Sequence, residues 1–317
     1  MPIAFYDAAR VEELLDYPGC IEAVRSAMVA LSSGERPQPL RQIFTVGEDD
    51  MFGTMPGELK ALSTFGAKLV SVFADPARPG RTRHQGIVVA YDGETGAVSC
   101  IADAEPVTKI RTGCATAVAT DALARADAEV LAVFGTGVQA DAHLRAVPLV
   151  RRFREIILWG RSAERTRQFA EQMSGEIGQA ITVVADGQEA AGRADIICTV
   201  TSSAEPVLLG EWVKPGTHVN LVGSSYLGPV EVDCALVAKA RYVADYRPGA
   251  LAQGAELAAA REAGVIDETY PIFEIGEVLA GRARGRENDS QVTIYKSLGH
   301  VVQDLAAAAY LQRQVKL

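Results

Sequence analysis

Apolar runs alternate with helical patterns through the second half of the chain, and the clearest junction between them is a glycine turn. Val130–Phe134 is entirely apolar and stops at Gly135, which is typical of a buried parallel strand, and residues 139–149 have the apolar spacing of a helix. Strand, tight turn and helix in this order form the context of a dinucleotide-binding fingerprint. In it Gly135 permits the turn, Gly137 lets a pyrophosphate approach the backbone, and Ala140 is the third small residue. The alternative is an ordinary turn in a Gly/Ala-rich chain.

The same alternation continues beyond this turn. Short apolar strands separated by helices at this pitch predict a doubly wound parallel sheet, an α/β fold of Rossmann type. The expected strands are 155–159, 181–184, 194–200, 218–222 and 241–244, and the expected helices include 163–173, 187–191, 233–238, 250–263 and 275–280.

The first third of the chain has a different pattern. A short strand at 3–6 precedes Asp7, which can cap a helix, and apolar residues at helical spacing continue to Gly34. Beyond it the pattern predicts a mostly antiparallel sheet with hairpin turns, whose strands are 42–46, 59–73, 86–91 and 97–103. Because no helices follow to cover this sheet, we expect the last helix, 297–312, to cross back to it.

Two lobes are expected, because 317 residues exceed one ordinary domain. We predict a discontinuous α+β domain of residues 1–114 and 292–317, and a dinucleotide-binding domain of residues 115–291. A helix at 111–125 would link the antiparallel sheet to the second domain.

Composition narrows the possible partners. An apolar content of 48% suffices for two cores, and a net charge of −9 argues against nucleic acids and anionic membranes, whose phosphates would be repelled. No signal peptide and no apolar stretch of about eighteen residues is visible, so a cytoplasmic protein is expected. The scattered cysteines contain no CxxC pair and favour free thiols over a metal site; they are Cys20, Cys100, Cys114, Cys198 and Cys234.

Several segments together resemble the ornithine cyclodeaminase/mu-crystallin family over nearly the whole chain. They are Gly66-Ala67-Lys68, His84-Gln85, residues 108–125 with Arg111-Thr112, and the segments 135–139, 159–162, 210–216 and 295–299. The resemblance implies a homodimer built through the antiparallel sheet, a Rossmann lobe that binds NAD(P), and a small amino or imino acid held between the lobes.

A hydride exchanges only with a carbon held close to the nicotinamide ring, so the substrate must be held by its other groups. For an amino or imino acid that handle is the carboxylate, and Arg41, Lys68 and Arg111 match the carboxylate-binding positions of the family. Arginine suits a bidentate contact, and lysine adds a transferable proton. Surface cations are the alternative, but the apolar neighbours of Lys68 disfavour its solvation.

The residues about twenty positions after the glycines indicate whether NAD or NADP is bound. NAD enzymes place an acidic residue there, against the ribose hydroxyls. Here Gly160, Arg161 and Ser162 follow the strand, and Arg165 lies one helical turn on, which favours NADP(H). NAD(H) stays possible, because Arg161 could instead stack on the adenine.

Further cofactor-binding candidates rest on the family positions. They are Thr136, Val138 and Gln139 with the two glycines of the turn, His84, Thr201, Ser202, Val222, Ser224, Ser225, Lys296 and Ser297. A structural role is the alternative for His84, and Ser297 could simply cap the last helix.

Ser225 directs the choice of reaction. Cyclodeaminases of the family carry an aspartate at this position, and serine, lacking a carboxylate, cannot replace it as a base at neutral pH. The ketimine-reducing branch also has serine. We therefore expect an NAD(P)H-dependent reductase of small imino acids such as Δ1-pyrroline-2-carboxylate or Δ1-piperideine-2-carboxylate. The alternatives are an alanine-type amino-acid dehydrogenase, a cyclodeaminase, and a non-enzymatic NADP-binding protein.

Overall fold

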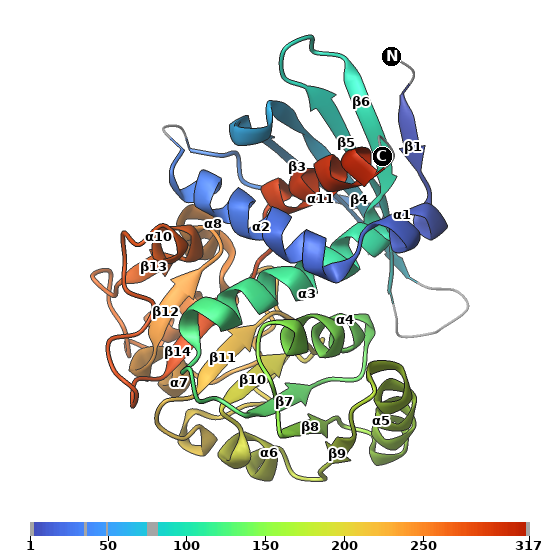
Figure 1. Ribbon diagram of the computed structural model, residues 1–317. Coiled ribbons are helices and arrows are strands. Elements are labelled where there is room, and N and C mark those ends of the chain that lie inside the picture. The colour runs from blue at the N-terminus through green and yellow to red at the C-terminus, as the bar shows by residue number, and fades with distance from the viewer. Residues whose placement is uncertain (1–2, 35–36, 49, 75–81, 315–317) are drawn as a thin grey trace. The chain divides into compact units, whose positions relative to one another are not determined.

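The computed structural model describes residues 3–34, 37–48, 50–74 and 82–314 (Figure 1). The chain divides into a first unit, Met1–Arg111 with His300–Leu317, and a second unit, Thr112–Gly299. The predicted boundaries at 114 and 291 differ from these, mainly because residues 293–296 belong to the second unit. The division of the chain into two domains with the predicted bounds stays a prediction.

The first unit contains a six-stranded sheet in the order β1-β6-β5-β4-β3-β2. Strand β1 is parallel to β6 and the other pairs are antiparallel, in agreement with the predicted α+β architecture. The strands are β1 (Ala4–Tyr6), β2 (Gln42–Val46), β3 (Asp50–Leu59), β4 (Thr64–Ala74), β5 (Thr82–Asp92) and β6 (Val98–Asp103).

One predicted strand, 59–73, is wrong at its start. Lys60–Leu62 forms a 3-10 turn and Ser63 adopts a φ of 47°, so β3 ends at Leu59 and β4 begins at Thr64. Strand β3 was missed because glycine and proline interrupt it and are poor strand formers. One of these glycines, Gly57, is needed: a Cβ there would lie 2.4 Å from Val301 of the last helix.

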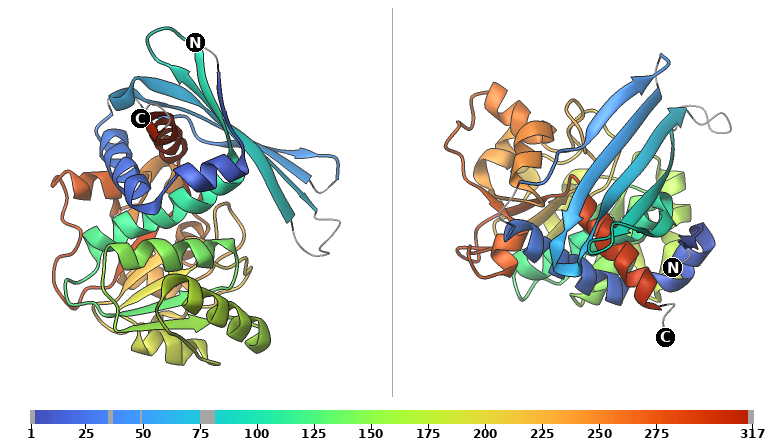
Figure 2. Two further views of the ribbon diagram at one scale, coloured as in Figure 1. Left: turned by 45° about the vertical axis from the view of Figure 1, so that its right-hand side comes forward. Right: turned by 90° about the horizontal axis from the view of Figure 1, so that it is seen from above.

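The helices of the first unit lie on one face of its sheet (Figure 2). Aspartates cap α1 (Ala8–Leu14) and α2 (Tyr17–Ser32), and α11 (Val301–Gln314) packs against α2 and the middle strands. The return of the last helix to this sheet is therefore as expected. Its start is not, because the helix begins at Val301 and Ser297 caps nothing.

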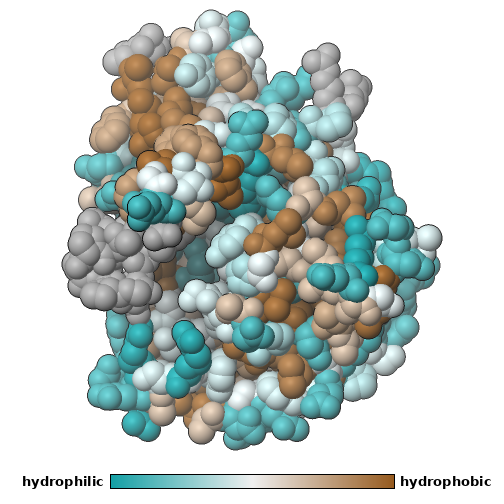
Figure 3. All heavy atoms as spheres, turned by 180° about the vertical axis from the view of Figure 1, so that it is seen from behind, coloured by the Kyte–Doolittle hydropathy of each residue, from teal (hydrophilic) through white to brown (hydrophobic). Residues whose placement is uncertain are grey.

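The opposite face of this sheet carries exposed aromatic side chains. Phe44 and Phe52 lie with ring centroids 5.4 Å apart on β2 and β3, and Phe65 stacks on Tyr91 across β4 and β5 at 5.1 Å. Phe44 is 57% exposed and Phe65 and Phe73 are 40% exposed. Figure 3 shows apolar side chains gathered over this sheet. We call this surface the aromatic face.

The second unit contains an eight-stranded, entirely parallel sheet in the order β13-β12-β14-β11-β10-β7-β8-β9. The chain starts in the interior at β7, moves outward to β8 and β9, and returns to β10 on the other side of β7. This confirms the doubly wound sheet, and the reversal between β7 and β10 is where such sheets bind ligands. The strands are β7 (Val130–Phe134), β8 (Glu155–Trp159), β9 (Ile181–Val183), β10 (Ile196–Thr199), β11 (His218–Leu221), β12 (Arg241–Ala244), β13 (Ile272–Glu274) and β14 (Thr293–Lys296).

Helices cover both faces of this sheet, as the alternation of side chains along β7 shows. Leu131 and Val133 pack in one core with residues of α4 and α5, whereas Ala132 and Phe134 pack in the other with α6, α7 and α9. The helices are α3 (Ala104–Leu123), α4 (Val138–Ala146), α5 (Ala163–Ile177), α6 (Gly187–Arg193), α7 (Cys234–Lys239), α8 (Arg247–Gln253), α9 (Ala255–Glu262) and α10 (Ile275–Leu279). Helix α3 contains the boundary between the units, and it starts before the predicted residue 111 because Pro106 suits a first helical turn.

Candidate functional site

The glycine turn has the geometry that its sequence predicts. Gly135 follows β7 with a φ of 130°, and a Cβ there would lie 2.9 Å from the carbonyl oxygen of Val200 after β10, so both conformation and space require glycine. Gly137 is the N-cap of α4, with nothing within 4 Å of the position of a Cβ. The backbone at the start of α4 is therefore unobstructed at Gly137 by the described residues, and a helix N-terminus is where anions bind.

The other candidates in the second unit share one edge of its sheet. They follow the carboxyl ends of β7, β8, β10, β11 and β14, and they are Thr136, Val138, Gln139, Gly160, Arg161, Ser162, Arg165, Thr201, Ser202, Val222, Ser224, Ser225, Lys296 and Ser297. Side chains of Arg161 and Arg165 are exposed, and Ser162 caps α5 by accepting a hydrogen bond from the backbone N–H of Arg165. Val222, Ser224, Lys296 and Ser297 are buried.

A buried carboxylate that the sequence reasoning missed organises this edge. Glu231 accepts hydrogen bonds from the hydroxyl of Thr199 at 2.7 Å, from the N–H and hydroxyl of Thr201 at 2.6 and 2.7 Å, and from the N–H of Gly223 at 2.7 Å. It thereby joins the ends of β10 and β11. Burial raises the pKa of Glu231, while the hydrogen bonds from Thr201 and Thr199 lower it. The signal available in the sequence was the position of Glu231 between two valines.

Lys296 is bound within the same unit. Its Nζ atom donates to the carbonyl oxygen of Ser224 at 2.6 Å and lies 2.7 Å from Oε2 of Glu256, and both charged side chains are almost fully buried. Lys296 therefore fixes the backbone of the loop after β11. That it also contacts a cofactor stays a prediction.

In the first unit, residues from three elements form a buried charged cluster. Lys68 of β4, Arg111 of α3 and Asp304 of α11 are 5%, 4% and 0% exposed. Oδ1 of Asp304 accepts a hydrogen bond from Nε of Arg111 at 3.0 Å and lies 3.7 Å from Nζ of Lys68. Lys68 also donates to the hydroxyl of Thr108 at 2.5 Å. The first two residues were predicted from the sequence, and Asp304 was not.

Burial lowers the pKa of Lys68 to about 8. Asp304 raises this pKa, and the positive charges of Arg111 and Arg41 lower it. A lysine in this range is mostly protonated at neutral pH and can still release its proton, which suits a proton donor. Burial also lowers the pKa of His300, which precedes α11, to about 4, so this imidazole is neutral at pH 7.

The remaining two candidates of the first unit are less defined. Arg41 precedes β2, is half-buried, and is close enough to Lys68 to influence its pKa. His84 lies on β5 opposite Val72 of β4, and its side chain is outside the described part of the structure. Its role stays a prediction.

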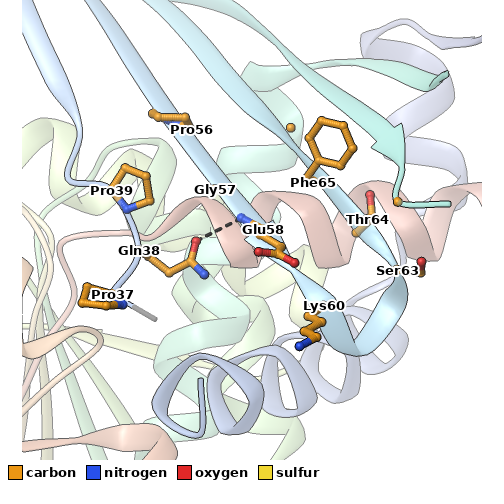
Figure 4. A pocket seen from close by; sticks show the side chains of 12 residues that line it. Pro37, Gln38, Pro39, Pro56, Gly57, Glu58, Lys60, Ser63, Thr64 and Phe65 are labelled. Atoms are coloured by element: carbon orange, nitrogen blue, oxygen red, sulfur yellow. Dashed lines mark hydrogen bonds between the residues drawn. The ribbon is translucent and has the colours of Figure 1, made fainter. Parts of the chain in front are cut away.

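A groove of about 720 Å³ lies elsewhere in the first unit (Figure 4). It is open to the surface where β3 turns into β4, and Gln38 crosses it to accept a hydrogen bond from the backbone N–H of Glu58 at 3.0 Å. None of the residues that line it is a candidate, and the buried charged cluster is not part of it.

Other kinds of site find no support within the described ranges. No group of three or more His, Cys, Asp or Glu side chains there is arranged to hold a metal ion. In the same ranges, no helix combines the length and apolar character needed to cross a bilayer.

The sequence profile of the ornithine cyclodeaminase/mu-crystallin family matches residues 3–316. The chain belongs to this family. It is 32% identical over 311 residues to the ketimine reductase mu-crystallin of Mus musculus, covering 96% of this chain and 95% of the relative. It is 33% identical over 295 residues to a Δ1-pyrroline-2-carboxylate reductase of Bacillus cereus, covering 92% and 90%.

A solved structure gives the same result for the fold. The Δ1-pyrroline-2-carboxylate reductase of Thermococcus litoralis, in complex with NADH and L-proline, superposes with a TM-score of 0.93 and 31% identity, covering 99% of this chain and 98% of that one. The family resemblance and the Rossmann fold expected from the sequence are both confirmed.

Proposed function

We propose that this protein is an NAD(P)H-dependent reductase of small imino acids, acting on Δ1-pyrroline-2-carboxylate or Δ1-piperideine-2-carboxylate. The observation that carries the proposal is the match, over almost the whole chain, to reductases of C=N bonds, one of them seen with NADH and L-proline. L-Proline is the product expected when hydride is added to C2 of Δ1-pyrroline-2-carboxylate.

In this proposal the carboxyl edge of the parallel sheet holds a nicotinamide cofactor, which supplies the hydride when bound. The turn from Gly135 to Gly137 and the start of α4 would bind the pyrophosphate, and the open space in front of Gly137 fits such a group. Thr201, Ser202 and the segment 222–225 would line the nicotinamide. Their small side chains allow close approach of a ring.

The buried charged cluster of the first unit would bind the substrate's carboxylate and manage its proton. Arg111 and Lys68 would neutralise the carboxylate with help from Arg41, as charge-assisted contacts to an anion are strong where water is excluded. Lys68, with a pKa of about 8, would keep the imine nitrogen protonated. A protonated imine has a more electrophilic C2 and accepts hydride more readily.

Ser225 favours reduction over cyclodeamination. Its side chain is half-buried in the loop after β11, and a serine there offers no carboxylate to act on a substrate amine. The cofactor preference proposed from Arg161 and Arg165 is NADPH over NADH, because two exposed cations after β8 favour a 2′-phosphate.

We further propose a homodimer formed through the aromatic face. Within the described residues, the helices packed on this sheet lie on its other face, and large exposed apolar surfaces on proteins mark interaction sites. A second copy of the chain would cover the rings of Phe44, Phe65 and Phe73. Sedimentation equilibrium at micromolar concentration tests this, and a monomer would contradict it.

A set of parallel assays distinguishes the candidate reactions. Oxidation of NADPH and NADH is followed by fluorescence with the two cyclic imines, and in parallel with pyruvate and ammonia. Turnover of cyclic imines without ammonia is the expected result. A requirement for ammonia would indicate an amino-acid dehydrogenase, ammonia release from ornithine without net cofactor change would indicate a cyclodeaminase, and cofactor binding without turnover would indicate a binding protein.

A further inference from the structure

Asp304 is a fully buried carboxylate near the start of α11, where the apolar run from Leu305 to Ala308 follows it. Isolation of a carboxylate from water is costly unless partners compensate it, so its neighbours indicate its role. Both neighbours are residues proposed to bind substrate: Arg111, which donates to Oδ1 at 3.0 Å, and Lys68, whose Nζ lies 3.7 Å from the same oxygen.

The preceding residue of α11 contributes to the same contact. Gln303, also fully buried, accepts a hydrogen bond from Nη1 of Arg111 at 2.7 Å. Two consecutive side chains of α11 thus bind two of the three guanidinium nitrogens. This fixes the plane of the Arg111 guanidinium, which a bidentate contact to a substrate carboxylate requires.

The charges around Lys68 give Asp304 a second role. The charged and titratable groups facing it are Asp304 of α11, Arg111 of α3 and Arg41 before β2, and the nearby His300 is neutral at pH 7. Two cations therefore oppose the positive charge of Lys68, and one carboxylate supports it. In a desolvated site this single anion has a large influence on whether the amine is protonated.

We propose that Asp304 is a positioning residue of the substrate site, which orients the guanidinium of Arg111 and keeps the amino group of Lys68 charged. The proposal rests on the proposed imine reduction for its catalytic consequence. The interaction itself is a property of the protein alone, and it can be measured without substrate.

The first test measures the protonation of Lys68 directly. Nζ chemical shifts of lysine-labelled protein are followed by NMR between pH 6 and 11, and Lys68→Met identifies the signal. In Asp304→Asn the midpoint for Lys68 is expected to fall by about 1 unit or more. An unchanged midpoint would overturn the proposal, whether or not the protein reduces imines.

The second test measures the pH dependence of imine reduction. Since Lys68 is proposed to act protonated, kcat/KM should be lost as pH rises through its pKa, and Asp304→Asn should move this loss to lower pH by the same amount as the NMR midpoint. A lower rate with an unmoved profile would show that Asp304 is merely structural and would overturn the proposal.

Two further variants separate charge from packing. Gln303→Met removes a neutral acceptor of Arg111, so KM for the imino acid should rise while the pH profile stays in place. Asp304→Glu keeps the charge and should restore the profile of the wild type, and failure to restore it would count against the proposal. If NMR shows the shift and no imine is reduced, Asp304 keeps its role and only the proposed function fails.

Discussion

Two buried lysines, one in each unit, are held in different ways. Nζ of Lys68 lies 3.7 Å from Asp304 and donates to a hydroxyl, and the side chain is 5% exposed. Nζ of Lys296 lies 2.7 Å from Glu256, donates to a backbone carbonyl oxygen, and is 0% exposed. Both belong to segments that resemble the family, and the sequence distinguishes Lys68 only by its apolar neighbours.

The difference in how the two amino groups are held indicates which buried lysine can transfer a proton. A lysine in direct contact with a carboxylate and a carbonyl oxygen is a fixed structural element, because each partner is satisfied only while the amine stays charged. A lysine at greater distance from its carboxylate, with other cations nearby, has a lowered pKa and can transfer its proton. Lys68 fits this second description, whereas Nζ of Lys296 lies in direct contact with its carboxylate.

Of the variants proposed here, Lys68→Met should have the largest effect on activity, and it tests directly whether Lys68 transfers a proton. We expect kcat/KM to fall by about 10²–10⁴-fold at pH 7, because the substitution removes the proposed proton donor together with a carboxylate contact. The fold should persist, since a methionine suits this buried position. Steady-state kinetics and circular dichroism check both, and a rate near that of the wild type would remove Lys68 from the mechanism.

The same variant makes a prediction about stability and pH. The folded pKa of about 8 lies below the ordinary 10.5, so between these values the unfolded chain binds more protons than the folded one, and Lys68 makes the wild type more stable as pH rises. The melting temperature of Lys68→Met relative to the wild type should therefore fall across this window. A constant difference would contradict the lowered pKa.

Lys296→Met should behave oppositely, with a loss of stability as its main effect. The substitution leaves Glu256 buried without its cation, which costs about 3–5 kcal/mol. Urea unfolding measures this, and the double variant Lys296→Met/Glu256→Leu should recover much of the loss. Should Lys296→Met prove as stable as Lys68→Met, the distinction between the two lysines would break down.

Glu231→Gln tests whether the carboxyl edge of the parallel sheet depends on its buried acid. The amide offers one acceptor oxygen, so its NH₂ group must face N–H or hydroxyl donors of Thr201, Thr199 or Gly223, at a cost of about 1–3 kcal/mol. Affinity for NAD(P)H should fall while KM for the imino acid changes little. Titration calorimetry measures the first quantity, and Glu205→Gln, an exposed acid, is the matched control.

The two buried acids also show where sequence reasoning ends. The partners of Asp304 are 193 and 236 positions away along the chain, and Glu231 binds residues about 30 positions earlier and 8 positions earlier. Lys68 was found because apolar neighbours made its solvation implausible. The same argument applies to Glu231, which lies between two valines, and to Asp304, which an apolar run follows, but only the fold identifies the cations and amides that each of them meets.

For the fold, apolar period and turn chemistry predicted the short, strongly apolar strands but missed the ten-residue β3. Strands β2, β7, β8 and β12 were predicted to the residue, whereas β13 and β14 were not predicted. Strand β14 has four residues, of which Thr293, Ile294 and Tyr295 are good strand formers, and it lies between β11 and β12 inside the sheet. Its place follows from pairing with distant strands, which no local pattern contains.

Arg161→Asp should have the smallest effect on stability, because Arg161 is an exposed cation, unlike the two buried lysines. Water already solvates its charge, so the free energy of unfolding should change by less than about 0.5 kcal/mol.

Arg161 should instead affect the binding of a ligand whose charged group lies at the end of β8. Reversing the charge at residue 161 should lower the preference for NADPH over NADH by about tenfold. The ratio of kcat/KM for the two cofactors measures this, with Arg167→Asp, an exposed arginine on the following helix α5, as the matched control. An unchanged ratio would show that the 2′-phosphate is not bound here and would favour adenine stacking by Arg161.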